Sequence, residues 1–128
     1  MDAVEYFPVA SALESMNLPF SDAVRVGTML HLSGVVGLDE RGVLVAGGIG
    51  PETRQALANV RAVLERRGSS MDRVVKCTVM LADMAEWEAM NRVYVESFPT
   101  HLPARSAFGA SALALGSRVE IECLATVD

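Results

Sequence analysis

In the run VEIECLATV, from Val119 to Val127, two glutamates alternate with apolar or small side chains. Apolar or small side chains occupy every second position, and Glu120 and Glu122 stand between them. Because successive side chains of a strand point to opposite faces, the run predicts a strand with one buried face and one face that carries two carboxylates. Either these carboxylates are simply solvated, or one of them orients a water molecule in a site.

Strand-like and helix-like periods alternate along the rest of the chain and predict six strands and two helices. We expect strands near 4–7, 23–26, 29–33, 74–81, 105–111 and 118–127, and helices over 51–67 and 84–98. This order favours an α+β fold, in which both helices cover one face of a single sheet. The length suits one domain, residues 1–128. Since the other sheet face also needs cover, the order further indicates an oligomer.

Two local patterns refine these expectations. In the strand near 74–81, Val75, Cys77 and Val79 are expected on one face with Leu81, and Lys76 on the other. Before the second helix, DMAE (83–86) resembles a capping box, in which an aspartate and a glutamate satisfy the first free amide groups.

Composition and charge argue against several functions. The formal net charge is −5, and the eleven lysines and arginines are scattered, with only Arg66 and Arg67 adjacent, so we expect no nucleic-acid partner. No apolar run reaches the roughly 18 residues of a membrane span. The start, MDAVEYFPVA, lacks the basic region of a signal peptide, which favours a cytoplasmic location.

Neither cysteine nor histidine spacing indicates a metal site. Cys77 and Cys123 lie far apart in sequence, outside any CxxC motif, and are expected to be buried, reduced thiols rather than the alternatives, a disulfide or a redox pair. No set of His, Asp or Glu residues has the spacing of metal ligands, so we predict neither metal nor cofactor.

Arg105 is the other charge in a strand-like segment, LPARSAF. Either it reaches solvent or pairs with a carboxylate from a strand edge, or it clamps the carboxylate of a substrate with its planar, bidentate guanidinium. The residues alone leave both alternatives open.

The segments PARSAF and VEIECLATV together resemble the end of the RidA (YjgF/YER057c/UK114) family, where P-A-R-S is followed about a dozen residues later by (V/I)-E-(I/V)-E. LPFSDAVRVGTMLHLSG and the central block from Gly47 to Pro99 resemble the corresponding family segments, so the resemblance covers nearly the whole chain.

The resemblance implies a chorismate-mutase-like α+β fold and a homotrimer with clefts between its subunits. It implies an enzyme that hydrolyses reactive 2-imino or enamino acids, such as 2-aminoacrylate, to 2-keto acids and ammonia without a cofactor. Arg105 would bind the substrate carboxylate, and Glu120 would orient or deprotonate the attacking water. Phe20, Ser33, Gly34 and Ala107 would line the site.

Three residues depart from the family pattern: Phe20 replaces the usual tyrosine, Ala107 a frequent cysteine, and Val35 a glutamine. These changes indicate a more apolar pocket and keep three alternatives open. One is a related hydrolase or isomerase for a different small carboxylate, of the aminomuconate-deaminase type. The second is a trimer that binds a small ligand without turnover. The third, RNA cleavage, is disfavoured by the acidic charge.

Overall fold

A computed structural model describes residues 3–10 and 16–128. Its regular elements are six strands and two α-helices, joined by loops and short 3₁₀ turns. The strands are β1 (Val4–Pro8), β2 (Ser21–Val26), β3 (Met29–Leu32), β4 (Val74–Leu81), β5 (Ala104–Gly109) and β6 (Val119–Thr126). The helices are α1 (Ile49–Arg66) and α2 (Trp87–Tyr94). The number and order of elements agree with the sequence prediction, with shifts of only a few residues at their ends.

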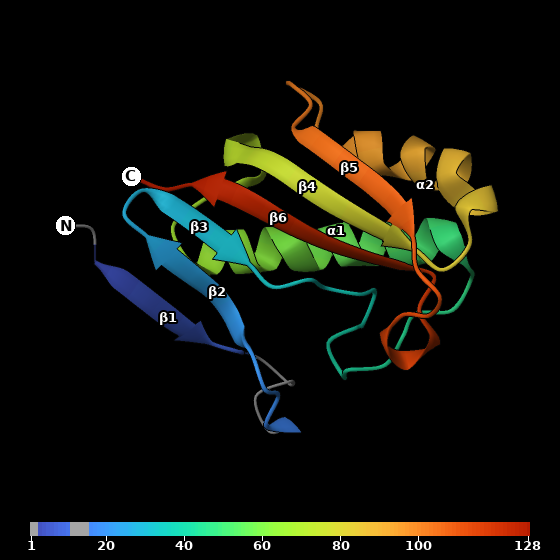
Figure 1. Ribbon diagram of the computed structural model, residues 1–128, viewed down its shortest axis with the longest axis horizontal. Helices are drawn as coiled ribbons and strands as arrows, with labels where there is room; N and C mark the ends of the chain where they lie inside the picture. Colours follow the sequence, from blue (N-terminus) through green and yellow to red (C-terminus); the bar gives the residue numbers. More distant parts are fainter. Residues whose placement is uncertain (1–2, 11–15) are drawn as a thin grey trace.

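All six strands form one mixed sheet in the order β1-β2-β3-β6-β4-β5 (Figure 1). Every pairing is antiparallel except that of β4 with β5, which is parallel. The parallel pair requires a crossover connection, and α2 supplies it. As a result β6 enters the middle of the sheet, between β3 and β4, while β5 forms one edge.

Both helices pack on the same face of the sheet, as expected. Figure 1 shows α1 running behind the strands. The core between helices and sheet contains Leu57 and Leu64 from α1, Met90 and Tyr94 from α2, and Ile121 from β6. The opposite sheet face carries no helix of the described residues, and we call it the open face.

Helix α1 ends as the sequence predicts. Gly68 adopts a φ of 84°, in the left-handed region that glycine tolerates best. Just after it, the amide of Ser69 donates to the carbonyl of Leu64, which satisfies one of the free carbonyls at the helix end.

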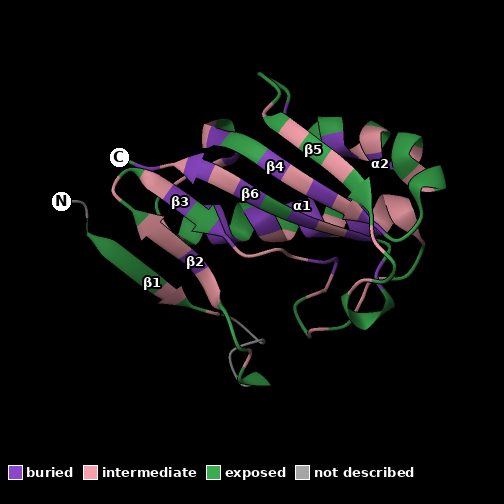
Figure 2. Ribbon diagram, viewed as in Figure 1, coloured by how far each residue is buried: buried purple, intermediate pink, exposed green. Residues whose placement is uncertain are grey.

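Burial along β6 confirms the predicted alternation. Val119, Ile121, Cys123 and Ala125 are buried, whereas Glu122 is exposed and Glu120 is partly buried (Figure 2). Because β6 is a central strand, its carboxylates do not lie on a solvated sheet edge. They project from the middle of the open face.

Strand β4 differs from the prediction at its start. Val75 was expected on the core face, but it is 42% exposed and Val74 is buried instead. The register between β4 and β6 shifts between Val74 and Lys76. Such a bulge displaces the side-chain alternation by one residue, and the period of two does not reveal it.

None of the helices within residues 3–10 and 16–128 is long and apolar enough to cross a bilayer.

Candidate functional site

Arg105 lies on edge strand β5, and its side chain points to the helix-covered face. In the parallel register it stands beside Cys77 of β4, whose side chain is buried in the core. Its guanidinium carbon lies 4.8 Å from the ring centre of Tyr94 and 5.7 Å from that of Trp87. Nη1 also lies 3.9 Å from the sulfur of Met90. We call these three side chains of α2 the aromatic cradle.

The aromatic cradle holds the cation without neutralising it. Aromatic faces attract a guanidinium but leave its in-plane N–H groups able to donate to an anion. Among the described residues Arg105 takes part in no ion pair, although seven other arginines do. Among the described residues, Arg105 therefore does not pair with a carboxylate of its own chain, as one of the two alternatives would require. An oriented, unpaired guanidinium suits a carboxylate ligand.

Glu120 lies on the open face, against the backbone of Gly34. A side chain at position 34 would overlap the Glu120 carboxylate, so the glycine makes room for it. Partial burial, and then the charge of Glu122, raise the pKa of Glu120 above its usual value. A carboxylate with a raised pKa is a stronger base than an ordinary surface glutamate, which suits proton transfer near neutral pH.

Gly34 contacts the Glu120 carboxylate, and its chain neighbour Ser33 connects it to the start of β2. Val35 and Ile121 exchange two backbone hydrogen bonds of 2.9 Å, which fixes Gly34 beside β6. The Ser33 hydroxyl donates to the carbonyl of Ser21 at 2.6 Å, so its oxygen can still accept a hydrogen bond from a ligand. Phe20 directly precedes Ser21 and is 50% exposed. Gly34 thus contacts Glu120 directly, and Ser33 and Phe20 are linked to it through the chain and the Ser33–Ser21 hydrogen bond.

Ala107 lies on the Arg105 side instead. It is two residues further along β5, stands beside Val79, and packs against the core. The predicted site residues therefore fall into two groups. Arg105 and Ala107 form the first, which we call the arginine half-site. Glu120, Gly34, Ser33 and Phe20 form the second, the glutamate half-site.

These two half-sites do not meet within one chain. Arg105 and Glu120 lie in the last two strands of the chain, but β4 separates β5 from β6, which sets the strands roughly 10 Å apart. Arg105 pairs with Cys77 and Glu120 with Met80, three positions further along β4. Because an odd number of positions separates these partners, the two charges point to opposite faces of the sheet.

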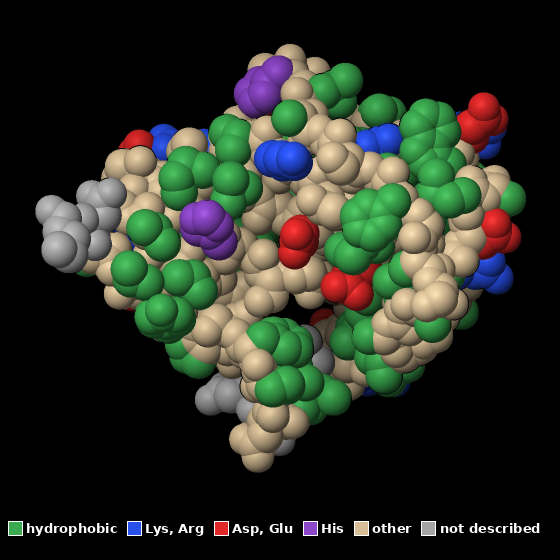
Figure 3. All heavy atoms as spheres, viewed as in Figure 1, with side chains coloured by type: hydrophobic (Ala, Val, Ile, Leu, Met, Phe, Trp, Pro, Cys, Tyr) green, Lys and Arg blue, Asp and Glu red, His purple; other side chains and the backbone are tan. Residues whose placement is uncertain are grey.

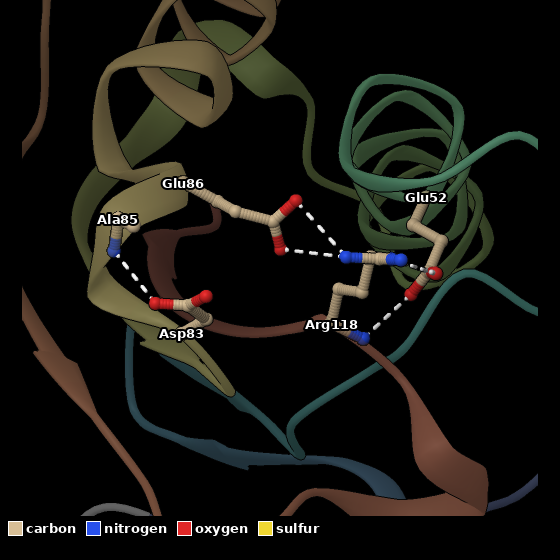
Figure 4. Close-up of polar contacts among 5 residues, drawn as sticks. All are labelled: Glu52, Asp83, Ala85, Glu86 and Arg118. Atoms are coloured by element: carbon tan, nitrogen blue, oxygen red, sulfur yellow. Dashed lines mark hydrogen bonds and ion pairs between the residues drawn. The ribbon is translucent and has the colours of Figure 1, made fainter.

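An ion network around one buried glutamate, not predicted from the sequence, fixes the entry to β6 (Figure 4). The backbone amide of Arg118 donates to Oε1 of buried Glu52 at 2.7 Å. Its guanidinium donates to both carboxylate oxygens of Glu86, at 3.0 and 3.1 Å. Asp83 caps the turn before α2 by accepting from the amide of Ala85 at 2.9 Å. Glu86 thus pairs with Arg118 rather than completing the expected capping box.

This network joins the elements that carry the two half-sites. Glu86 directly precedes Trp87 of the aromatic cradle, and Arg118 lies two residues before Glu120. In the sequence, Trp87, Met90 and Tyr94 recur at helical spacing, a pattern that equally fits a helix packed on a core. No sequence pattern marked Arg118 as part of this network, because an arginine just before a strand is common.

Two hollows among the described residues are not lined by Arg105. The larger, about 510 Å³, lies near the starts of β4 and β5 and is lined by Arg73, His101 and Leu102 among others. The smaller, about 330 Å³, lies on the open face between His31, Lys76 and Glu122. Figure 3 shows acidic side chains near the centre of this face, flanked by hydrophobic ones.

No group of three or more potential metal ligands occurs among the described residues.

The arrangement of sheet, helices and half-sites agrees with a comparison against known families. A profile described as Endoribonuclease L-PSP matches residues 10–127. The chain belongs to this family, whose members include the RidA proteins. A mouse relative named 2-iminobutanoate/2-iminopropanoate deaminase is 46% identical over 108 residues, which cover 84% of this chain and 80% of the mouse protein. The Reactive Intermediate Deaminase A, chloroplastic, of Arabidopsis thaliana is 40% identical over 110 residues, or 85% of this chain and 59% of that protein.

A solved structure confirms the fold. The crystal structure of YyfA, a protein of unknown function of the conserved Rid protein family from Yersinia pestis, superposes with a TM-score of 0.90. It is 33% identical and covers 98% of this chain and all of its own. The RidA-like mixed sheet with two helices is thereby confirmed.

Proposed function

We propose that this RidA-family chain hydrolyses reactive 2-imino and enamino acids to 2-keto acids and ammonia. One observation carries the proposal: an unpaired guanidinium is held on an aromatic cradle in a chain that also exposes a carboxylate of raised pKa. The names of the mouse and Arabidopsis relatives support the same reaction.

The proposed chemistry follows from the two charges. Arg105 binds the substrate carboxylate through two parallel N–H donors and so places the imine carbon. Glu120 accepts a proton from a water molecule, and the water oxygen adds to that carbon. Protonated Glu120 gives this proton to the imine nitrogen, which completes a carbinolamine. Glu120 then moves the proton of the new hydroxyl to the same nitrogen, the C–N bond breaks, and ammonia leaves as the keto group forms. Imines hydrolyse spontaneously in water, so positioning and one acid–base group suffice.

We further propose that the site is completed between copies in a homotrimer. Arg105 and Glu120 point to opposite faces of one sheet, so a single chain does not bring them together. A ring in which the β5 edge of one copy meets the open face of the next would join an arginine half-site to a glutamate half-site at every interface. The same contacts would cover the apolar part of the open face.

The pocket composition favours bulkier substrates as an alternative. Phe20 is half exposed and carries no hydroxyl, and Ala107 adds no polar group beside Arg105. A pocket of this kind would accept 2-imino acids with larger side chains, as in the aminomuconate-deaminase type. RNA is the poorer substrate, because Glu120 and Glu122 on the open face repel a phosphate backbone.

The test couples a pyridoxal-phosphate threonine/serine dehydratase to keto-acid formation while semicarbazide traps free imine. Wild-type protein should increase keto acid and reduce the trapped product, whereas Arg105→Ala should not. Arg61→Ala is the matched control, because Arg61 is an exposed arginine of α1 that pairs only with Glu65. Precursors with larger side chains, oxidised to imines by an amino-acid oxidase, test the alternative. Failure of the wild type with every precursor would end the deaminase proposal.

We also propose a cytoplasmic location. The Arabidopsis relative is named chloroplastic, so the location within this family varies. Fractionation of the source cells followed by immunoblotting would decide the location of this chain.

A further inference from the structure

Cys77 and Cys123 face each other across the centre of the sheet. They are directly opposite in the antiparallel pairing of β4 with β6, and their sulfur atoms lie 2.6 Å apart. Both are free thiols. Cys77 is 0% exposed and Cys123 is 4% exposed, because both point into the layer between sheet and helices. The deaminase chemistry uses neither of them.

The backbone at this pair already suits a disulfide. Residues directly opposite in an antiparallel pair have Cα atoms about 4.5 to 5.5 Å apart. A disulfide joins Cα atoms roughly 4.4 to 6.8 Å apart. The bond can therefore close with little movement of either strand, and the core residues around it need not repack.

The two thiols differ in their surroundings. Hydrogen bonding to Cys123 lowers the pKa of Cys77, and the Tyr94 hydroxyl and the Arg105 cation act in the same direction. The hydrogen bond to Cys77, together with burial, raises the pKa of Cys123. Cys77 also stands beside the partly exposed edge strand β5, whereas Cys123 lies one strand further inside. Cys77 is the better nucleophile of the pair.

We propose that Cys77 and Cys123 are a site of reversible oxidation, at which a peroxide converts the two thiols into a cross-strand disulfide. The Cys77 thiolate attacks one peroxide oxygen, the O–O bond breaks, and a sulfenic acid and water form with hydrogen peroxide as the oxidant. The Cys123 sulfur then attacks the Cys77 sulfur, a second water leaves, and the S–S bond forms. Two thiols and one hydrogen peroxide thus give one disulfide and two waters, and a dithiol reductant reverses the reaction.

Closure of this bond would tie β4, beside Arg105, to β6, which carries Glu120. The two cysteines are 46 residues apart in sequence, so the crosslink closes a long loop and restrains the unfolded chain. We expect the oxidised protein to unfold several degrees above the reduced protein. Such a transient disulfide is compatible with a reducing compartment, where redox-responsive disulfides occur.

The experiment treats the folded wild-type protein with hydrogen peroxide, blocks remaining thiols with an alkylating agent under denaturing conditions, and measures intact mass. The expected product has lost the mass of two hydrogen atoms, takes up no alkylating agent, and yields one crosslinked peptide that contains Cys77 and Cys123. Dithiothreitol should restore both thiols. If both thiols remain alkylatable, or if sulfinic acid accumulates without a crosslink, the proposal is wrong.

Single variants distinguish the order of attack from simple exposure of a thiol. In Cys123→Ala, peroxide followed by dimedone should label Cys77, because its sulfenic acid has no partner. In Cys77→Ala, labelling of Cys123 should be at least several-fold slower. Equal rates would contradict the assignment of Cys77 as the attacking thiol. Circular dichroism of each variant confirms folding, and the wild-type result stands without either variant.

Discussion

The arginine half-site and the glutamate half-site use opposite physical environments. Arg105 lies beneath α2, with aromatic rings on its faces and no carboxylate within reach among the described residues. Glu120 projects from the open face, with a second carboxylate as its neighbour and only a glycine beneath it. Packing against the aromatic cradle orients Arg105, which forms no ion pair among the described residues. The missing side chain at Gly34 leaves room for the Glu120 carboxylate, and the charge of Glu122 helps to raise its pKa.

This difference underlies our proposal that a second copy of the chain completes the site. A sheet separates the two charges, and no side-chain rotation moves either through it. A cation and a base on opposite faces of one sheet are expected when a second copy supplies the half-site that the first copy lacks. The predictions below test this arrangement, from the largest expected effect to the smallest.

Arg105→Ala and Glu120→Gln should each lower kcat/KM for imine hydrolysis by roughly 100- to 1000-fold, because each removes a charged group from the site. Mixed trimers, refolded from equal amounts of the two variants, should regain activity in roughly a quarter of their sites. In such a site the intact arginine of one copy meets the intact glutamate of the next.

Steady-state keto-acid formation measures both effects. Each variant refolded alone is the control for the mixing experiment. A mixture no more active than its inactive parents would show that one chain provides both charges, and the arrangement between copies would then be abandoned.

Gly34→Ala should lower kcat/KM by roughly 10- to 100-fold, because the new methyl group displaces the Glu120 carboxylate. Gly34 does not have a positive φ, so alanine itself fits the backbone there. Gly50→Ala is the matched control, since its methyl group would only reach ordinary contact with Val93. Comparable losses in both variants would indicate general destabilisation, which thermal unfolding would detect.

Trp87→Leu should lower kcat/KM by about two- to fivefold, because a cation–π contact at a partly exposed site contributes about 0.5–1 kcal/mol. Trp87→Phe should retain most of the activity. Val95→Ala, which removes an exposed apolar side chain near the end of α2, is the control and should have no effect. A Trp87→Leu enzyme with unchanged KM and kcat would remove Trp87 from the aromatic cradle as a functional element.

Glu122→Gln should shift the acid limb of the pH–rate profile to lower pH. A general base loses activity as pH falls through its pKa, and burial and the Glu122 charge both raise that pKa. Removal of the charge lowers the pKa of Glu120, so the base stays ionised in more acidic solution, while the larger effect of burial remains. Glu88→Gln, an exposed change on α2, should leave the profile unchanged. A shift toward higher pH would contradict the assignment of Glu120 as the base.

Much of the fold could be predicted from the sequence because its signals are local. Alternation along β6 reports one buried face, and Pro51 and Gly68 mark the two ends of the helical segment. The error at Val75 has a physical cause, since a bulge in one strand depends on its pairing partner. The aromatic cradle was visible only as a helical stripe, because burial and cation binding favour the same residues at the same spacing.

The sequence by itself determined the elements, the faces of β6, and the presence of one arginine and two carboxylates in strand-like segments. Only the tertiary structure decided where these charges stand. Inserting β6 between β3 and β4 separates Arg105 from Glu120, and the parallel register of β5 turns Arg105 toward the helices. Strand order and register arise from contacts between residues distant in the chain, so no local pattern encodes them. For the same reason, the contact between Cys77 and Cys123 became visible only when their strands were paired.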